Sequence, residues 1–249
     1  MIATITWMHW TAFTLAVVFF LALDLGVFHR KAHSVKFKEA LIWTGIWFTM
    51  AMLFAWGLSF LRGQQEALEF VTGYIVELSL SMDNVFVIAL IFGYFRVPLA
   101  YQHRVLFWGI MGALIMRGIM IGAGAALVRQ FDWTLMVFGA FLVFTGIKML
   151  FAKEEGVDPE KNMAIRLARK FLPISPRYDK QHFITHVNGR RMFTPLVLVL
   201  VMVEATDLIF ALDSIPAIFG ITTNEFIVFT SNVFAILGLR SLYFVLAGA

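Results

Sequence analysis

The chain has 249 residues, a formal net charge of +4 and a mean hydropathy of +0.82, and it is 60% hydrophobic but only 14% charged. So little charge excludes a soluble globular protein of this size and indicates an integral membrane protein. The absence of cysteine excludes disulfides, thiolate metal sites and thiol redox chemistry. We expect no nucleic-acid partner, because the basic residues are distributed as membrane topology requires.

A helix needs about 20 mainly apolar residues to cross a bilayer. Seven stretches meet this requirement, so we expect an all-α polytopic membrane protein with about seven transmembrane helices in a single transmembrane domain. The first stretch has no basic segment before it and no small-residue cleavage site after it, so it is expected to be a retained span. The predicted spans are residues 6–28, 39–60, 67–95, 103–128, 132–151, 195–219 and 225–248.

The basic residues predict the orientation of these spans. Of the 20 Lys and Arg residues, 16 lie in segment 29–38, in the turn after the third span, or in the loop 152–194 and its edge. The opposite side has only Arg62 and Arg129, and the remaining two arginines lie inside spans. Because cytoplasmic loops carry the excess of basic residues, we expect a bacterial inner-membrane protein with its N-terminus outside and the loop 152–194 in the cytoplasm.

The cytoplasmic loop contains two recognisable elements. Residues 160–172 place Met163, Leu167 and Phe171 on one face and basic residues elsewhere, a pattern that suits a short helix lying on the anionic inner leaflet. The run HFITHVNGRRMFT has an Asn-Gly pair between two β-prone segments, which predicts a hairpin with a two-residue turn. His182 and His186 could form a metal pair in that hairpin, but without an acidic partner nearby they are better interpreted as solvated surface residues.

Acidic residues inside the spans are the main functional signal. An ionisable group at the bilayer centre costs about 2.5–3.5 kcal/mol, so six would cost about 15–20 kcal/mol if each faced lipid unpaired. Arg117 and Arg240 could neutralise two of them as structural counter-charges, which leaves four that need protons or cations. The six acids are Asp24, Glu77, Asp83, Glu204, Asp207 and Asp213.

The spacing of four of these acids indicates an internal repeat. Glu77 and Asp83 in the third span are six residues apart, as are Asp207 and Asp213 in the sixth, and each next span carries an arginine. Repeats three spans apart cross the membrane in opposite directions, which is the inverted three-helix repeat design of secondary transporters. We therefore expect one acidic site near the bilayer midplane, with Asn84 beside it.

Helical geometry places the second acid of each pair on a different face from the first. Residues six apart point about 120° away from each other in a straight helix. Local unwinding would bring them together, and Pro216 could cause it in the sixth span, whereas the third span has no proline. In the fourth span, Gly118, Gly122 and Gly124 predict a face on which helices pack closely.

Three motifs resemble the TerC/Alx family of bacterial integral membrane proteins: VELSLSMDNVFV, FDWTLMVFGAFLVFTGIKML and EATDLIFALDSIPAIFGITTNEFIVFTSNVFAILGLRSLYF. The resemblance extends from the first span to the end of the chain. The family is associated with tellurium resistance, and its Alx branch with manganese export. By resemblance, Glu77, Asp83, Asp207 and Asp213 would handle the metal, with Asn84, Glu204 and Asp24 supporting them.

Members of that family usually continue with about two more spans and a polar tail. The span 132–151, which follows the first arginine-bearing span, has no counterpart after the second one. We therefore expect a truncated chain whose C-terminal spans are missing.

The expected function is secondary transport of a divalent metal ion. Carboxylate, amide and hydroxyl oxygens suit Mn²⁺, Mg²⁺ and Ca²⁺, and the resemblance selects Mn²⁺ among them. Buried carboxylates would hold protons in the empty site, so metal export could be coupled to inward proton movement. We expect no enzymatic activity, no resident cofactor and no direct use of ATP, because no GxxxxGK[ST] motif is present.

Two alternatives remain. A non-transporting membrane factor, which would assist metal homeostasis or membrane-protein biogenesis, would use the basic loop as its partner surface and the acids as internal contacts. An intramembrane hydrolase would use paired carboxylates as an aspartyl dyad, but no glycine-flanked catalytic pattern supports it. The sequence leaves the oligomeric state open.

Overall fold

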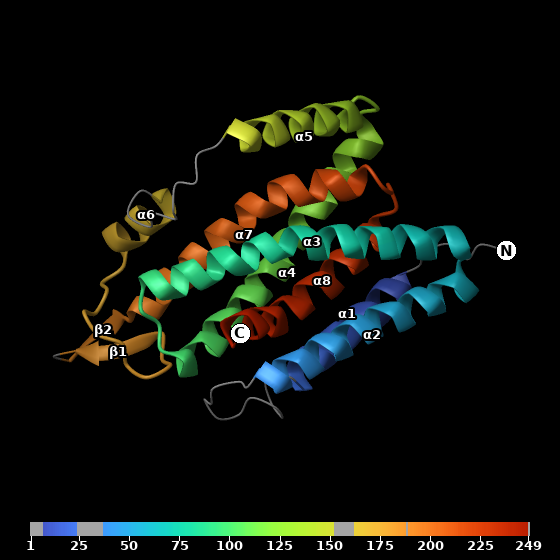
Figure 1. Ribbon diagram of the computed structural model, residues 1–249. Coiled ribbons are helices and arrows are strands. Elements are labelled where there is room, and N and C mark those ends of the chain that lie inside the picture. Colours follow the sequence, from blue (N-terminus) through green and yellow to red (C-terminus); the bar gives the residue numbers. More distant parts are fainter. Residues whose placement is uncertain (1–6, 24–36, 152–161, 188, 249) are drawn as a thin grey trace.

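A computed structural model describes residues 7–23, 37–151, 162–187 and 189–248 (Figure 1). Within these residues, six helices are long and apolar enough to cross a membrane, and a seventh apolar helix at the N-terminus is shorter. The expectation of an all-α polytopic membrane protein is therefore confirmed. The elements are α1 (Trp7–Leu23), α2 (Phe37–Leu61), α3 (Gln64–Tyr94), α4 (Leu99–Gln130), α5 (Thr134–Phe151), α6 (Met163–Phe171), β1 (Ile184–Val187), β2 (Arg190–Phe193), α7 (Pro195–Phe219) and α8 (Glu225–Ala247).

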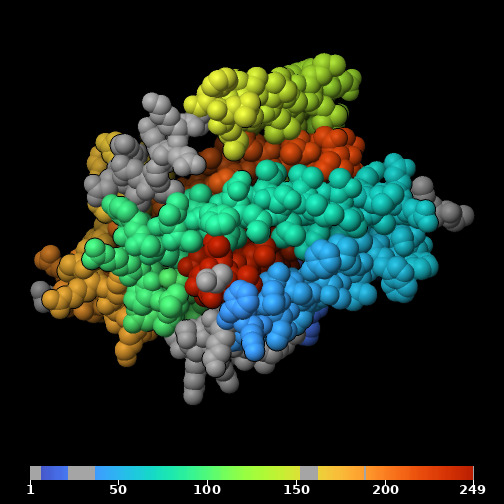
Figure 2. All heavy atoms as spheres, viewed as in Figure 1, coloured from blue at the N-terminus to red at the C-terminus, as the bar shows by residue number. Residues whose placement is uncertain are grey.

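The last helix, α8, lies at the centre of the bundle. Asn224 precedes its first residue and caps the helix, because the Asn224 side chain accepts a hydrogen bond from the backbone N–H of Phe226. Most of its side chains are buried, because α2, α3 and α4 all pack against it. In the space-filling view only a small patch of α8 is visible between α3 and α2 (Figure 2).

The long helices form two three-helix repeats of opposite direction. In Figure 1, α2, α3 and α4 run alternately across the bundle, and α5, α7 and α8 do the same in the reverse sense. α3 packs on α8 and α4 packs on α7, as an inverted repeat requires, while α2 and α5 flank α3 and α7. The sequence spacing leaves the span 132–151 without a counterpart. In the structure this span is α5, and it is the first helix of its repeat, as α2 is of the other. The halves differ in one respect: α2 also packs on α8, whereas α5 contacts α4 only slightly.

The loop between α5 and α7 forms the two predicted elements. Asn162 caps α6 by accepting hydrogen bonds from the backbone N–H groups of Ala164 and Ile165, and buried Ile165 and Ala168 pack α6 against α7. β1 and β2 pair as an antiparallel hairpin, and Gly189 in its turn has a φ of +76°, a left-handed conformation that favours glycine. The predicted short helix and the predicted hairpin are both present, and the location of the helix on the inner leaflet stays a prediction.

The segment that leads into this hairpin contacts the turn after α3 and the first part of α4. The Tyr178 hydroxyl donates a hydrogen bond to the Phe95 carbonyl (2.7 Å), and the Arg104 guanidinium lies 5.4 Å from the centre of the Phe183 ring. Burial raises the pKa of the Tyr178 hydroxyl above its ordinary value. We call this side of the bundle the hairpin end. Two further residues there, His182 and His186, are exposed, and among the described residues no group of three or more His, Cys, Asp or Glu could hold a metal.

Candidate functional site

A buried arginine joins the two repeats at the middle of the bundle. Arg117 on α4 is 2% exposed, and its guanidinium contacts one carboxylate from each repeat. The Nε and Nη2 atoms donate to Asp207 on α7, over 3.2 and 2.8 Å, and Nη1 donates to Glu77 on α3. Charge-assisted bonds of this kind are about twice as strong as neutral ones, so this arginine fixes the relative positions of three helices.

Neutral side chains complete the arrangement. Nη1 of Arg117 also approaches Asn232 Oδ1 on α8 (3.1 Å) and Ser214 Oγ on α7 (3.4 Å). The Asn84 amide donates to Asp207 Oδ1 over 2.9 Å. We call these residues, together with buried Ser81, the central cluster; its members are Glu77, Ser81, Asn84, Arg117, Asp207, Ser214 and Asn232.

Helical spacing accounts for the α3 side of the central cluster. Glu77, Ser81 and Asn84 follow one another at i, i+4 and i+7, and all three are buried on the inner face of α3. Asp207 and Ser214 occupy one face of α7 in the same way. Glu77 lies 13 residues from the start of α3, or about 20 Å along the helix at 1.5 Å per residue, so the cluster is near mid-depth.

Three oxygens of α3 have no hydrogen-bond partner among the described residues. They are Glu77 Oε2, Ser81 Oγ and Asn84 Oδ1, one from each residue of the inner face. A cavity of about 20 Å³ lies against Asn84 and Asp207, with Arg240 on its wall, and a space above about 10–15 Å³ can hold one water-sized species. Buried acceptors without partners cost free energy, so this face is suited to a bound ion, proton or water.

The second acid of each pair lies away from the central cluster. Asp83 is exposed on the outer face of α3, and Asp213 is partly exposed on α7. The local unwinding predicted to bring them inward is wrong, because α3 and α7 are continuous helices through these positions. Pro216 sits three residues before the end of α7, where the helix is about to stop in any case. The second acid of each pair therefore points about 120° away from the first, as in a straight helix.

Glu204 lies one turn from Asp207, toward the hairpin end of α7. Its side chain is partly buried, and a Cβ atom added at Gly112 would overlap its carboxylate, so the acid rests against the bare backbone of α4. The last candidate, Asp24, lies outside the described residues. Among described residues no group of three or more potential His, Cys, Asp or Glu ligands comes together, so metal binding by the seven candidate residues stays a prediction.

Sequence reasoning assigns Arg117 a counter-charge role, which the structure supports, but it does not identify Asn232 as part of the cluster. The available signal was a lone amide in the apolar run FTSNVFAILGLR, where a polar side chain needs an internal partner.

The negative and positive groups of the cluster are unequal in number. One guanidinium bonds two carboxylates, so Glu77, Asp207 and Arg117 together carry a formal charge of −1, while buried Arg240 lies on the wall of the neighbouring cavity.

Comparison with known sequences identifies the family. The sequence profile of the Integral membrane protein TerC family matches residues 62–249, which is well over half of the chain. The chain belongs to the TerC family. It is therefore a multi-pass integral membrane protein, and the proposed resemblance to this family is confirmed.

Several curated relatives are similar over most of this TerC-family chain. An "Uncharacterized membrane protein STKORF319" of Myxococcus xanthus is 54% identical over 240 residues, covering 96% of this chain and 75% of that protein. The "Putative membrane-bound redox modulator Alx" of Escherichia coli (strain K12) is 47% identical over 248 residues, covering 96% and 77%. An "Uncharacterized membrane protein" of Rickettsia felis is 42% identical over 240 residues, covering 96% and 80%. No solved structure matches the chain significantly.

Proposed function

We propose that this TerC-family protein is a secondary transporter that exports a divalent metal ion, with Mn²⁺ as the favoured substrate. The observation that carries the proposal is the set of three unpartnered oxygens on α3, which belong to a cluster in which two carboxylates share one guanidinium. A cation would satisfy both the oxygens and the charge. Glu77, Asn84 and Asp207 are the proposed first ligands.

The chemistry of the available donors supports a hard cation. The central cluster offers carboxylate, amide and hydroxyl oxygens, and the chain has no cysteine. Such oxygen donors suit Mn²⁺, Mg²⁺ and Ca²⁺ rather than the softer metals. The choice of Mn²⁺ among these three rests on the resemblance to the Alx branch of the family.

The architecture supports alternating access. Two inverted repeats meet at the central cluster, and in secondary transporters the substrate site lies at such an interface near the midplane. The excess of basic residues at the hairpin end favours a cytoplasmic location for this end in a bacterial inner membrane, with the N-terminus outside. Proton binding to cluster carboxylates when the metal leaves would couple export to inward proton movement.

Flux measurements in inverted membrane vesicles test this proposal. Vesicles with the wild-type chain should accumulate Mn²⁺ when a proton gradient is applied, and Glu77→Gln should abolish the uptake without reducing the amount of protein in the membrane. Asp132→Asn is the matched control, because Asp132 is an exposed acid outside the cluster. Wild-type vesicles that take up no more Mn²⁺ than vesicles without the protein would refute the transporter.

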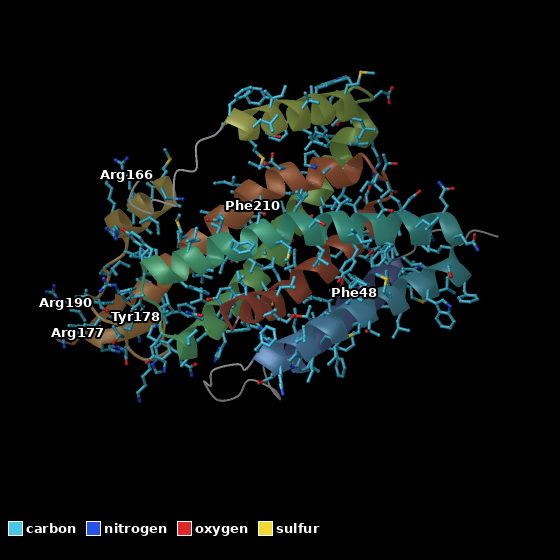
Figure 3. All side chains as sticks on the ribbon, in the orientation of Figure 1. Phe48, Arg166, Arg177, Tyr178, Arg190 and Phe210 are labelled. Atoms are coloured by element: carbon cyan, nitrogen blue, oxygen red, sulfur yellow. The ribbon has the colours of Figure 1, made fainter. Side chains whose placement is uncertain are left out.

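One observation favours a second function, that of a non-transporting membrane factor. Exposed Arg166, Arg177 and Arg190 project from the hairpin end, which could serve as a partner surface (Figure 3). Relatives are named as putative redox modulators, but a thiol-based redox role is incompatible with a chain that has no cysteine. Replacing the three arginines with glutamine would separate the two functions. A partner factor would lose its effect on metal homeostasis or membrane-protein biogenesis, while a transporter would retain Mn²⁺ flux.

A further inference from the structure

We propose that Arg117 is a tethered cation that occupies the metal site when the site is empty and must leave its carboxylates for a divalent ion to bind. This inference rests on the proposed function, because it describes how the same site is kept stable between transport cycles. Arg117 then acts as a built-in competitor, which goes further than the structural counter-charge role assigned to it from the sequence.

The first argument is geometric. The guanidinium lies between Glu77 and Asp207, one carboxylate from each repeat, and bonds both oxygens of Asp207. A divalent ion bound by these carboxylates would approach their oxygens to about 2.0–2.6 Å. The guanidinium and the metal would then compete for the same lone pairs at close range and repel each other as like charges. Both cannot hold the two carboxylates together.

The second argument is charge. With Arg117 in place, the two carboxylates and one guanidinium sum to −1, which does not match a divalent ion. Once the guanidinium moves away, the carboxylates alone carry −2, which a divalent cation neutralises. In an apolar bundle that match is worth more than it would be in water, because low dielectric strengthens every charge interaction.

The third argument is that neutral acceptors for the displaced arginine lie beside its present position. Nη1 already approaches Asn232 Oδ1 at 3.1 Å and Ser214 Oγ at 3.4 Å, and neither acceptor is charged. A rotation of the long side chain that turns the guanidinium toward Asn232 and Ser214 and away from Glu77 and Asp207 would exchange the charged acceptors for neutral ones. Asn232 therefore acts as a positioning residue that holds Arg117 in the metal-bound state.

Metal binding by the purified full-length chain tests this inference. Arg117→Gln should bind Mn²⁺ at least about tenfold more tightly than wild type, because the metal no longer has to break charge-assisted bonds that are each worth that factor or more. Mn²⁺ should also raise the unfolding temperature of Arg117→Gln more than that of wild type. Arg129→Gln is the control, because Arg129 is exposed and pairs with Glu225 outside the cluster.

Two further variants keep the inference testable if Arg117→Gln does not fold. Arg117→Lys retains a charge that cannot span both carboxylates as a guanidinium does, and its Mn²⁺ affinity should exceed that of wild type. Asn232→Ala removes an acceptor for the displaced arginine and should weaken Mn²⁺ binding. Unchanged or weaker Mn²⁺ binding in both Arg117 variants would overturn this inference, but it would not contradict the proposal that the protein transports Mn²⁺. Absence of wild-type Mn²⁺ binding and flux would instead remove the proposed function itself.

Discussion

The two carboxylates bonded to Arg117 should respond very differently to the same isosteric change. Asp207 accepts three hydrogen bonds: Oδ2 accepts from Arg117 Nε, and Oδ1 accepts from Arg117 Nη2 and Asn84 Nδ2. In Asp207→Asn the amide nitrogen must face at least one of these donors in either orientation. Breaking a buried ion pair from one side costs about 3–5 kcal/mol.

Glu77 has a free oxygen, which makes the corresponding change milder. Its Oε1 accepts from Arg117, while its Oε2 has no partner among the described residues. In Glu77→Gln the amide oxygen can keep the bond to Arg117, and the amide nitrogen can take the position of the unpartnered Oε2. The loss is then the difference between a charged and a neutral acceptor, about 1 kcal/mol.

Thermal unfolding of the purified protein in detergent measures this difference. One kcal/mol corresponds to about 2–4 °C in the unfolding temperature of a chain of this size. Asp207→Asn should therefore lower the midpoint by about 6–20 °C, and Glu77→Gln by no more than about 4 °C. Equal losses in the two variants, or a larger loss in Glu77→Gln, would refute the assignment of the free oxygen to Glu77.

Glycine substitutions test the helix contacts that surround the site. Gly124→Ala places a Cβ 2.9 Å from the buried Phe219 ring and should lower the unfolding temperature, because overpacking costs about 1–3 kcal/mol. The Cβ of Gly122→Ala meets nothing within 4 Å, so this change should raise the unfolding temperature, because alanine has a higher helix propensity than glycine. Gly112→Ala should displace the flexible Glu204 carboxylate and reduce Mn²⁺ flux while leaving the unfolding temperature unchanged or higher. Normal flux in Gly112→Ala would exclude a transport role for the present position of Glu204.

Periodicity and charge predicted the architecture, because both act locally along the chain. The apolar runs, the amphipathic pattern before Phe171 and the Asn-Gly turn each specify an element without reference to the rest of the fold. The equal six-residue spacing of acids correctly predicted an inverted repeat. It did not show that α5 pairs with α2, because the helix that precedes each acid-bearing span carries no acid pair to reveal the match.

The membership of the central cluster could be predicted only in part. The expected location of Asn84 beside the acids is confirmed, because Asn84 and Glu77 are both buried on the inner face of α3 and Asn84 bonds Asp207. The expected convergence of Asp83 with them required a break in α3, which nothing in its sequence produces, and the helix is continuous. Asn232 was missed because the rotation of α8 about its axis is set by packing against three neighbours, which no pattern within α8 encodes.

The positions of the acids in the structure modify the sequence-based argument about the free-energy cost of burying carboxylates in the bilayer, but they do not overturn it. Unpaired acids in a bilayer are costly, and two of them, Glu77 and Asp207, share Arg117, which compensates one of their two negative charges. A membrane protein that binds a divalent ion only part of the time faces a particular difficulty, because its empty site would hold two unpaired carboxylates in a medium of low dielectric. A tethered guanidinium reduces that difficulty. Its single positive charge stabilises the empty bundle and leaves one negative charge of the carboxylate pair uncompensated. Under the proposed exchange, a divalent ion should be favoured over a monovalent one, because only two positive charges can both displace the arginine and neutralise the carboxylate pair that it leaves.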